Sequence, residues 1–174
     1  ALTMTPNGAL KQSINYIEAI ASRDISDIDE VKREKEFTLR LLRSYARFQG
    51  AQAPLTSIYA DLKTNAESSM TEETISSYIT ALKKLFVIED APAWNPNLRS
   101  KTAIRTSDTR YFVDPSIATA ALGVGPEKLI ADLNTMGLLF ETMCIRDLRV
   151  YSEALDGKVY HFRDKNGLEC DAVT

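Results

Sequence analysis

The sequence of 174 residues contains 44% hydrophobic and 26% charged residues and carries a formal net charge of −3 at pH 7. This composition is typical of a globular protein with one domain or two small ones, and it excludes the disordered and fibrous classes. The small net charge also excludes a basic field over the whole molecule. Any contact with nucleic acid therefore has to come from a local patch.

Cysteine usage and hydropathy indicate the compartment. Cys144 and Cys170 stand alone, without CxxC spacing, and we predict free thiols in a reducing environment. No apolar run approaches the roughly 20 residues that cross a bilayer, and no secretory leader is visible. We therefore predict a cytoplasmic protein without a membrane partner.

The first part of the chain has a helical pattern that gives way to a charged stretch. In residues 11–21, the side chains of Ile14, Ile17 and Ile20 fall on one helical stripe. Residues 22–36 are dense in charge and poor in large apolar residues. We predict a helix followed by a linker or an exposed helix start.

Three further helices are predicted before residue 87. The first covers 37–48 and is followed by Gly50, and the second covers 55–62. The third is expected to begin at a capping box formed by Ser69 and Glu72.

After the third helix the period changes from helical to alternating. Residues 85–94 and 103–113 are predicted to be two strands that flank a turn-rich tip at 95–102. Three helices followed by a two-stranded hairpin is the order of a winged helix-turn-helix. A small α+β domain of no special kind remains the alternative.

The remaining sequence predicts helices and a second hairpin. Residues 114–122 and 125–155 are expected to be helical, with an interruption at Gly137 and a buried stripe that continues as far as Val150. Residues 158–174 predict a strand, an Asn-Gly turn and a second strand.

Two kinds of chemistry find little support. Residues 123–128, with the sequence GVGPEK, lack the spacing of a P-loop, so we expect no ATP site in this chain. His161 has too few partners for a zinc site or a nucleophilic site. We predict that it is a structural or surface histidine.

Two groups of basic residues are candidates for contacts with nucleic acid. The third helix carries Lys83 and Lys84, although Glu72 and Glu73 begin the same helix, at the end that enters the major groove in helix-turn-helix proteins. The hairpin carries candidates that have only Asp108 as a nearby acid, namely Arg99, Lys101, Arg105 and Arg110. A solvated surface is the alternative for both groups.

Two carboxylates are candidates for a metal site. Glu141 lies on a predicted helix and Asp171 on the last predicted strand. A nuclease that depends on a divalent metal needs acidic oxygens from separate elements that converge on one ion. The alternative is an exposed glutamate and an aspartate at a strand end.

Several segments together resemble one known family. They are NYIEAIASRDIS, ETISSYITALKKLFVIEDAPAWNPNLRSK, YFVDPSIATAAL, MGLLFETMCIRDLRVY and VYHFRDKNGLECDAV. In this order they resemble the C-terminal region of a large group of predicted bacterial and archaeal AAA-type ATPases. That region includes a domain of unknown function related to the restriction-endonuclease-like PD-(D/E)XK nucleases.

The resemblance implies a helix-rich α+β fold, with a winged helix-turn-helix followed by the N-terminal part of a PD-(D/E)XK nuclease-like domain. The domains would be a connector at 1–30, a winged-helix-like domain at 31–118 and a truncated nuclease-like domain at 119–174. A P-loop ATPase domain that binds ATP and Mg²⁺ would precede Ala1 in the parent protein, and this fragment itself would hold no cofactor.

The resemblance also gives the carboxylates a role. Glu141 matches the helix acid of the nuclease pattern and Asp171 the strand acid, with Glu169 two residues before it. The (D/E)xK strand would lie past Thr174. We therefore expect a non-catalytic fragment that binds nucleic acid, its own ATPase domain or a protein partner. The alternative is a part of a divalent-metal nuclease that is active only in the full-length protein.

Overall fold

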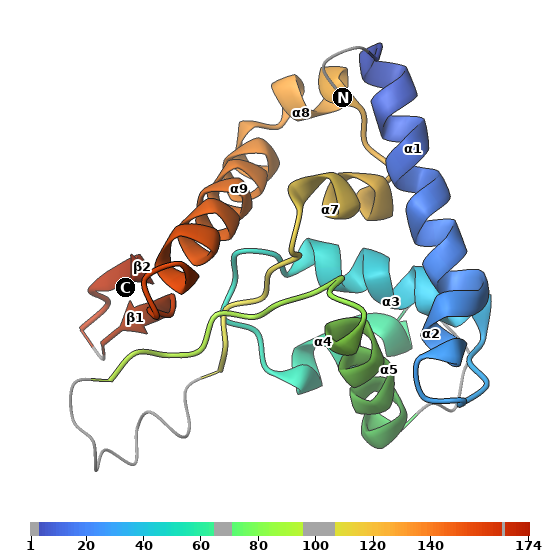
Figure 1. Ribbon diagram of the computed structural model, residues 1–174, viewed down its shortest axis with the longest axis horizontal. Helices are drawn as coiled ribbons and strands as arrows, with labels where there is room; N and C mark the ends of the chain where they lie inside the picture. Colours follow the sequence, from blue (N-terminus) through green and yellow to red (C-terminus); the bar gives the residue numbers. More distant parts are fainter. Residues whose placement is uncertain (1–3, 65–70, 96–106, 165) are drawn as a thin grey trace.

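Helices dominate the structure, and a two-stranded antiparallel hairpin follows them (Figure 1). The computed structural model describes residues 4–64, 71–95, 107–164 and 166–174. The predicted helix-rich α+β class is confirmed. In the described ranges, no helix combines the length and apolar character needed to span a membrane.

The N-terminal helix is longer than the sequence pattern predicts. Helix α1 (Pro6–Ala19) continues into the π-helical turn η1 (Ile20–Asp24) and the short helix α2 (Ile25–Asp27). Ile20 and Ile25 are buried. Part of the predicted linker is therefore a packed helix, because these apolar residues give the charged stretch one buried side.

Three helices form the body around a common core. They are α3 (Lys35–Arg47), α4 (Leu55–Thr64) and α5 (Glu72–Lys84). Aromatic side chains contribute to this core, where Phe37 and Tyr78 pack edge to face with ring centroids 4.8 Å apart. Helix α5 begins after Thr71, whose hydroxyl accepts a hydrogen bond from the backbone of Thr74. The N-cap of α5 is therefore Thr71, and the predicted cap residue Ser69 lies outside the described residues.

The segments that flank the predicted wing are joined by isolated bridges. Ile88 pairs with Phe112, and Ala91 pairs with Thr109, both antiparallel. The chain after α3 joins them, because Gln52 also pairs with Thr109. The antiparallel pairing is as predicted, but continuous strands do not form in the described residues.

The second half of the chain packs against this body through α7. Helix α7 (Pro115–Leu122) lies between α1 and α9 (Leu133–Glu153) and above α3 (Figure 1). Its N-cap Asp114 accepts hydrogen bonds from the backbone of Ser116 at 2.8 Å and from Arg146 of α9 at 2.7 Å.

A break separates α8 (Pro126–Ala131) from α9 (Leu133–Glu153). It lies at Asp132, whose side chain caps α9 by accepting from the backbone of Thr135. The predicted interruption at Gly137 is wrong. One glycine lowers the stability of a helix by only about 1 kcal/mol, so α9 continues through Gly137. The N-cap at Asp132, in contrast, begins a new helix.

The C-terminal hairpin is confirmed, with strands β1 (Tyr160–Arg163) and β2 (Glu169–Val173). The hairpin is also joined to the body. The backbone N–H of His161 donates to Pro92 at 3.0 Å, and that of Trp94 donates to the carbonyl of His161 at 2.6 Å. Contacts therefore cross the predicted boundary between residues 118 and 119.

Candidate functional site

The predicted metal ligand Glu141 is held on the inner side of α9. The hydroxyl of Tyr111, a buried residue in the bridged segment, donates a hydrogen bond to Glu141 Oε1. Gly50 lies on the other side, so close that a Cβ there would be 3.4 Å from the same oxygen. Glu141 is therefore a half-buried carboxylate fixed between two elements of the body.

The charges around Glu141 come from strand β2. Burial raises the pKa of Glu141, the hydrogen bond from Tyr111 opposes this, and the negative charges of Asp171 and Glu169 raise the pKa further. The negative charge of Asp171 therefore acts on Glu141, the other predicted carboxylate. Because the folded-state pKa is raised, Glu141 stabilises the fold below its unfolded pKa, and this contribution is lost as the pH rises through the folded value.

The carboxylates fit a metal site only in part. Carboxylate oxygens are ligands that Mg²⁺ and Mn²⁺ prefer. However, across the described ranges no group of three or more His, Cys, Asp and Glu residues is placed to hold a metal ion. Glu141 and Asp171 are therefore two donors without a third.

A second cluster surrounds Asp90, which the sequence analysis did not single out. Its side chain is 2% exposed and accepts hydrogen bonds from the Tyr45 hydroxyl and from Arg110 Nη1 at 2.6 Å. Lys83 Nζ lies 2.8 Å from the same carboxylate. Burial and the charge of Asp90 raise the pKa of Tyr45, so this hydroxyl stays protonated as a donor.

This cluster corrects the expected surroundings of Arg110. We expected only Asp108 as a nearby acid, but Arg110 is buried and its guanidinium contacts Asp90 and the carbonyl of Ala53. The reason is the pairing of the two segments. Because Ala91 pairs with Thr109, Asp90 and Arg110 face each other. We leave Arg110 out of any surface for nucleic acid.

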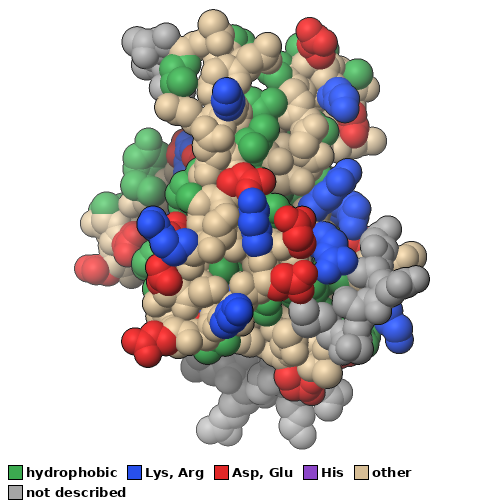
Figure 2. Space-filling model, turned by 90° about the vertical axis from the view of Figure 1, so that its right-hand side faces the viewer, with side chains coloured by type: hydrophobic (Ala, Val, Ile, Leu, Met, Phe, Trp, Pro, Cys, Tyr) green, Lys and Arg blue, Asp and Glu red, His purple; other side chains and the backbone are tan. Residues whose placement is uncertain are grey.

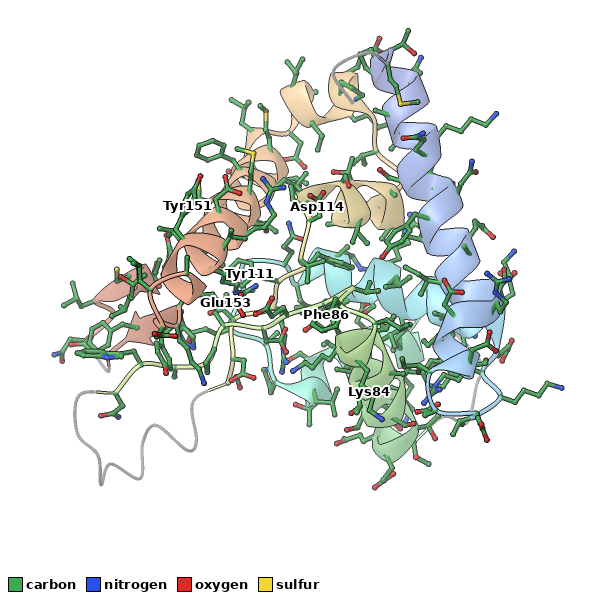
Figure 3. The ribbon with its side chains drawn as sticks, in the orientation of Figure 1. Lys84, Phe86, Tyr111, Asp114, Tyr151 and Glu153 are labelled. Carbon is green, nitrogen blue, oxygen red and sulfur yellow. The ribbon has the colours of Figure 1, made fainter. Side chains whose placement is uncertain are left out.

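The other candidate cations have different positions. Lys83 is half exposed and forms an ion pair with Asp90, whereas Lys84 is exposed at the end of α5 (Figure 3). Three of the predicted residues, Arg99, Lys101 and Arg105, lie outside the described residues. Glu72 and Glu73 occupy the first turn of α5, as the sequence indicates.

The charged surfaces in view are mixed in sign. On the face of the molecule seen in Figure 2, basic and acidic side chains are interspersed. Oppositely charged residues of the described chain also form ion pairs, as Lys35 and Glu18 do at 2.5 Å. Mixed charges of this kind favour solubility more than attraction of a polyanion.

A cavity of about 350 Å³ lies between the C-terminal half of α9 and the start of the hairpin. Its charged lining residues are Arg149, Lys158, Glu89, Asp90 and Glu153. Because Asp90 is paired with Lys83 and Arg110, two carboxylates and two cations remain, and the cavity favours neither sign of charge.

The outward side of α9 is the most unusual surface of the described chain. We call it the outer face of α9. Its large apolar residues, together with Ile130 of α8, are between 36% and 84% exposed; they are Leu133, Met136, Phe140, Leu148, Val150, Tyr151 and Leu155. Figure 3 shows Tyr151 on the side of α9 that points away from α7.

The predicted buried stripe of α9 is therefore wrong in part. Leu139 and Ile145 are buried, but Leu148 and Val150 are exposed. The helix instead turns Thr142 and Glu141 toward the body, because Tyr111 and Gly50 contact it there. The sequence of α9 has apolar residues on both sides of the helix, and this pattern could have indicated that one apolar side is exposed.

These features define a helix-rich α+β protein whose C-terminal hairpin is attached to the helical body. A family model described as a domain of unknown function, DUF8612, matches residues 5–128. The chain belongs to this family. No curated protein and no solved structure matches the chain.

Proposed function

We propose that this chain is a non-catalytic module that docks a protein partner through the outer face of α9. The observation that carries the proposal is the exposure of large apolar side chains along α9, including Phe140 and Tyr151, and just past its end at Leu155. Apolar patches of this extent on a folded protein mark interaction sites. Aromatic side chains at such sites supply much of the binding energy.

The body of this module is a winged helix in our proposal. Supporting it are the helices α3, α4 and α5, followed by the bridged segments around Ile88 and Phe112. In the same proposal, residues 119–174 are the first part of a nuclease-like domain. A longer parent protein would carry an ATPase domain that binds ATP and Mg²⁺, and that domain is one candidate partner.

Protein docking is favoured over nucleic-acid binding because two of the candidate basic residues are engaged in ion pairs within the protein. Arg110 and Lys83 both contact the buried carboxylate of Asp90. Glu72 and Glu73 place negative charge at the end of α5 that would enter a DNA groove.

Site-specific photo-crosslinking in cells tests the docking function. A benzophenone amino acid in place of Phe140 is expected to form a protein adduct, and one in place of Phe86 is not. Phe86 is the matched control, because it is 77% exposed but lies after α5, away from the outer face of α9. The adduct is identified by mass spectrometry.

A second substitution makes this test specific. Tyr151→Asp in the crosslinking variant is expected to abolish the adduct, because a charge in an apolar contact is costly to desolvate. Equal adducts at positions 140 and 86, or none at position 140, would rule out docking at this face.

The nuclease of a longer protein is the second candidate function. It is favoured by the negative charges of Asp171 and Glu169, which raise the pKa of Glu141. In this alternative Glu141 and Asp171 hold Mg²⁺ or Mn²⁺, and a further strand supplies the missing carboxylate and a lysine. The same protein could bind DNA through Lys84, Arg99, Lys101 and Arg105.

One experiment with labelled DNA tests both nucleic-acid functions. The 174-residue chain is expected to show no salt-dependent rise in anisotropy and no cleavage with Mg²⁺. Tight binding that weakens with salt and is lost when Arg99, Lys101 and Arg105 become alanine would show that nucleic acid is the ligand. Cleavage by a longer parent, lost on Asp171→Ala but kept on Asp164→Ala, would establish the nuclease.

A further inference from the structure

We propose that the partner on the outer face of α9 is the same face of a second copy of this chain. The two α9 helices would cross antiparallel about a two-fold axis at Cys144. This inference rests on the docking function proposed above and names its partner. It is carried by the spacing, shape, area and charge of the face.

A stripe that joins five residues of the outer face to Gly137 and the half-buried Cys144 has a spacing that is symmetric about Cys144. Along α9 and its end, the residues Leu133, Gly137, Phe140, Cys144, Leu148, Tyr151 and Leu155 succeed each other at separations of 4, 3, 4, 4, 3 and 4. Such steps of three and four keep the side chains from Leu133 to Tyr151 on one stripe of α9, and Leu155 follows in the turn after the helix. Reversing the helix about Cys144 leaves the pattern unchanged.

A two-fold interface needs this kind of symmetry. In such an interface the same patch is used by both subunits, so residue i contacts j′ and residue j contacts i′. The antiparallel register centred on Cys144 places Leu133 opposite Leu155′ and Phe140 opposite Leu148′. An interface with a different protein does not require a symmetric order of residues along the helix.

The shapes of the paired residues also agree. The register places Tyr151, which is 67% exposed, opposite Gly137′. Nothing lies within 4 Å of the position that a Cβ on Gly137 would occupy. A large aromatic ring thus meets the one position of the stripe without a side chain, as knobs meet holes between packed helices.

The area is large enough for a stable dimer. If a fully open large side chain exposes roughly 200 Å², the exposed parts of the outer face and Ile130 amount to roughly 1,000 Å². A standard interface buries roughly 800 Å² on each partner.

The charge of the face does not oppose the pairing. Asp147 borders the stripe, and Arg146 Nη2 lies 2.9 Å from its carboxylate. A second copy would therefore not place two unpaired carboxylates against each other, which would be costly on desolvation.

Sedimentation equilibrium and chemical crosslinking test the proposal on the full 174-residue chain. A reversible monomer–dimer equilibrium is expected. In a Cys170→Ser background, a short bismaleimide is expected to join Cys144 to Cys144′. A dimer that is not joined there has another register and overturns the proposal.

Two substitutions separate the interface from the stability of the monomer. Tyr151→Asp is expected to raise Kd at least ~30-fold, as for a central aromatic anchor. Gly137→Leu fills the hole and should also raise Kd about tenfold or more, yet it should raise the melting temperature of the monomer, since leucine favours the helix over glycine. Phe86→Asp, outside the face, leaves Kd unchanged.

The outcomes separate the partner from the docking function. A monomer at all concentrations, or a dimer indifferent to Gly137→Leu and Tyr151→Asp, overturns the second copy as partner. If a monomeric chain still crosslinks from position 140 to a different protein, the docking function stands without this partner. If position 140 gives no adduct and no dimer forms, both are wrong.

Discussion

Replacing Asp90 by alanine is expected to lower the free energy of unfolding by about 3–5 kcal/mol, because it leaves a buried guanidinium without its counter-ion. The side chain of Arg110 is 11% exposed, and its Nη1 bonds Asp90 at 2.6 Å. The Tyr45 hydroxyl also loses its acceptor. Urea denaturation followed by the fluorescence of Trp94, the single tryptophan, measures the change.

Two variants control this prediction. Asp108→Ala removes the acid that the sequence suggested as the partner of Arg110, and we expect it to cost about 0.5 kcal/mol or less, as for other partly exposed charges. Asp90→Ala combined with Arg110→Met should recover part of the loss, since the uncompensated charge is gone. A loss below about 1 kcal/mol for Asp90→Ala alone would mean that the buried pair does not support the fold.

Replacing Gly50 by alanine is expected to cost about 2–3 kcal/mol in stability, from two separate causes. Gly50 has φ +71°, which costs a residue with a Cβ about 1–2 kcal/mol. In addition, the new Cβ would lie 2.7 Å from Leu138 Cδ2 and 3.4 Å from Glu141 Oε1. Leu138 therefore has to move, and Glu141 loses its place beside Tyr111.

Gly123 separates the two causes. Its φ is +67°, but a Cβ there would meet nothing within 4 Å, so Gly123→Ala carries the backbone cost alone. In a Leu138→Ala background, Gly50→Ala should cost only slightly more than Gly123→Ala, because the weaker contact of the new Cβ with Glu141 remains. If the two glycine variants differ by less than about 0.5 kcal/mol in the unmodified chain, α9 does not pack on Gly50 as described. Urea unfolding measures all four variants.

Local sequence patterns predicted most of the helices and the C-terminal hairpin. The Asn-Gly turn is such a local signal: Gly167 has φ +83°, and Asp164 Oδ1 accepts from the backbone of Asn166 and Leu168. Errors arose where two local signals competed. At the start of α9, the cap at Asp132 prevailed over the glycine at position 137.

The candidate sites depended on which residues face each other, and that is not a local property. The partner of Arg110 follows from the register of its segment, since residues whose numbers add to 200 pair across it, as Ile88 pairs with Phe112. Had that register been assumed, Asp90 would have been placed opposite Arg110 from the sequence. The buried side of α9 could not be predicted, because apolar residues occur all round the helix.

The attachment of β1 to the body has a consequence for the order in which the chain folds. His161 Nδ1 lies 3.1 Å from Gln52 Nε2, a residue 109 positions earlier, and its backbone bonds Pro92 and Trp94. These partners are in place only after the segment around residue 91 has paired with that around 109. Closing so long a loop is slow. We therefore expect the docking of the hairpin on the body, rather than the formation of the hairpin itself, to be a late step of folding.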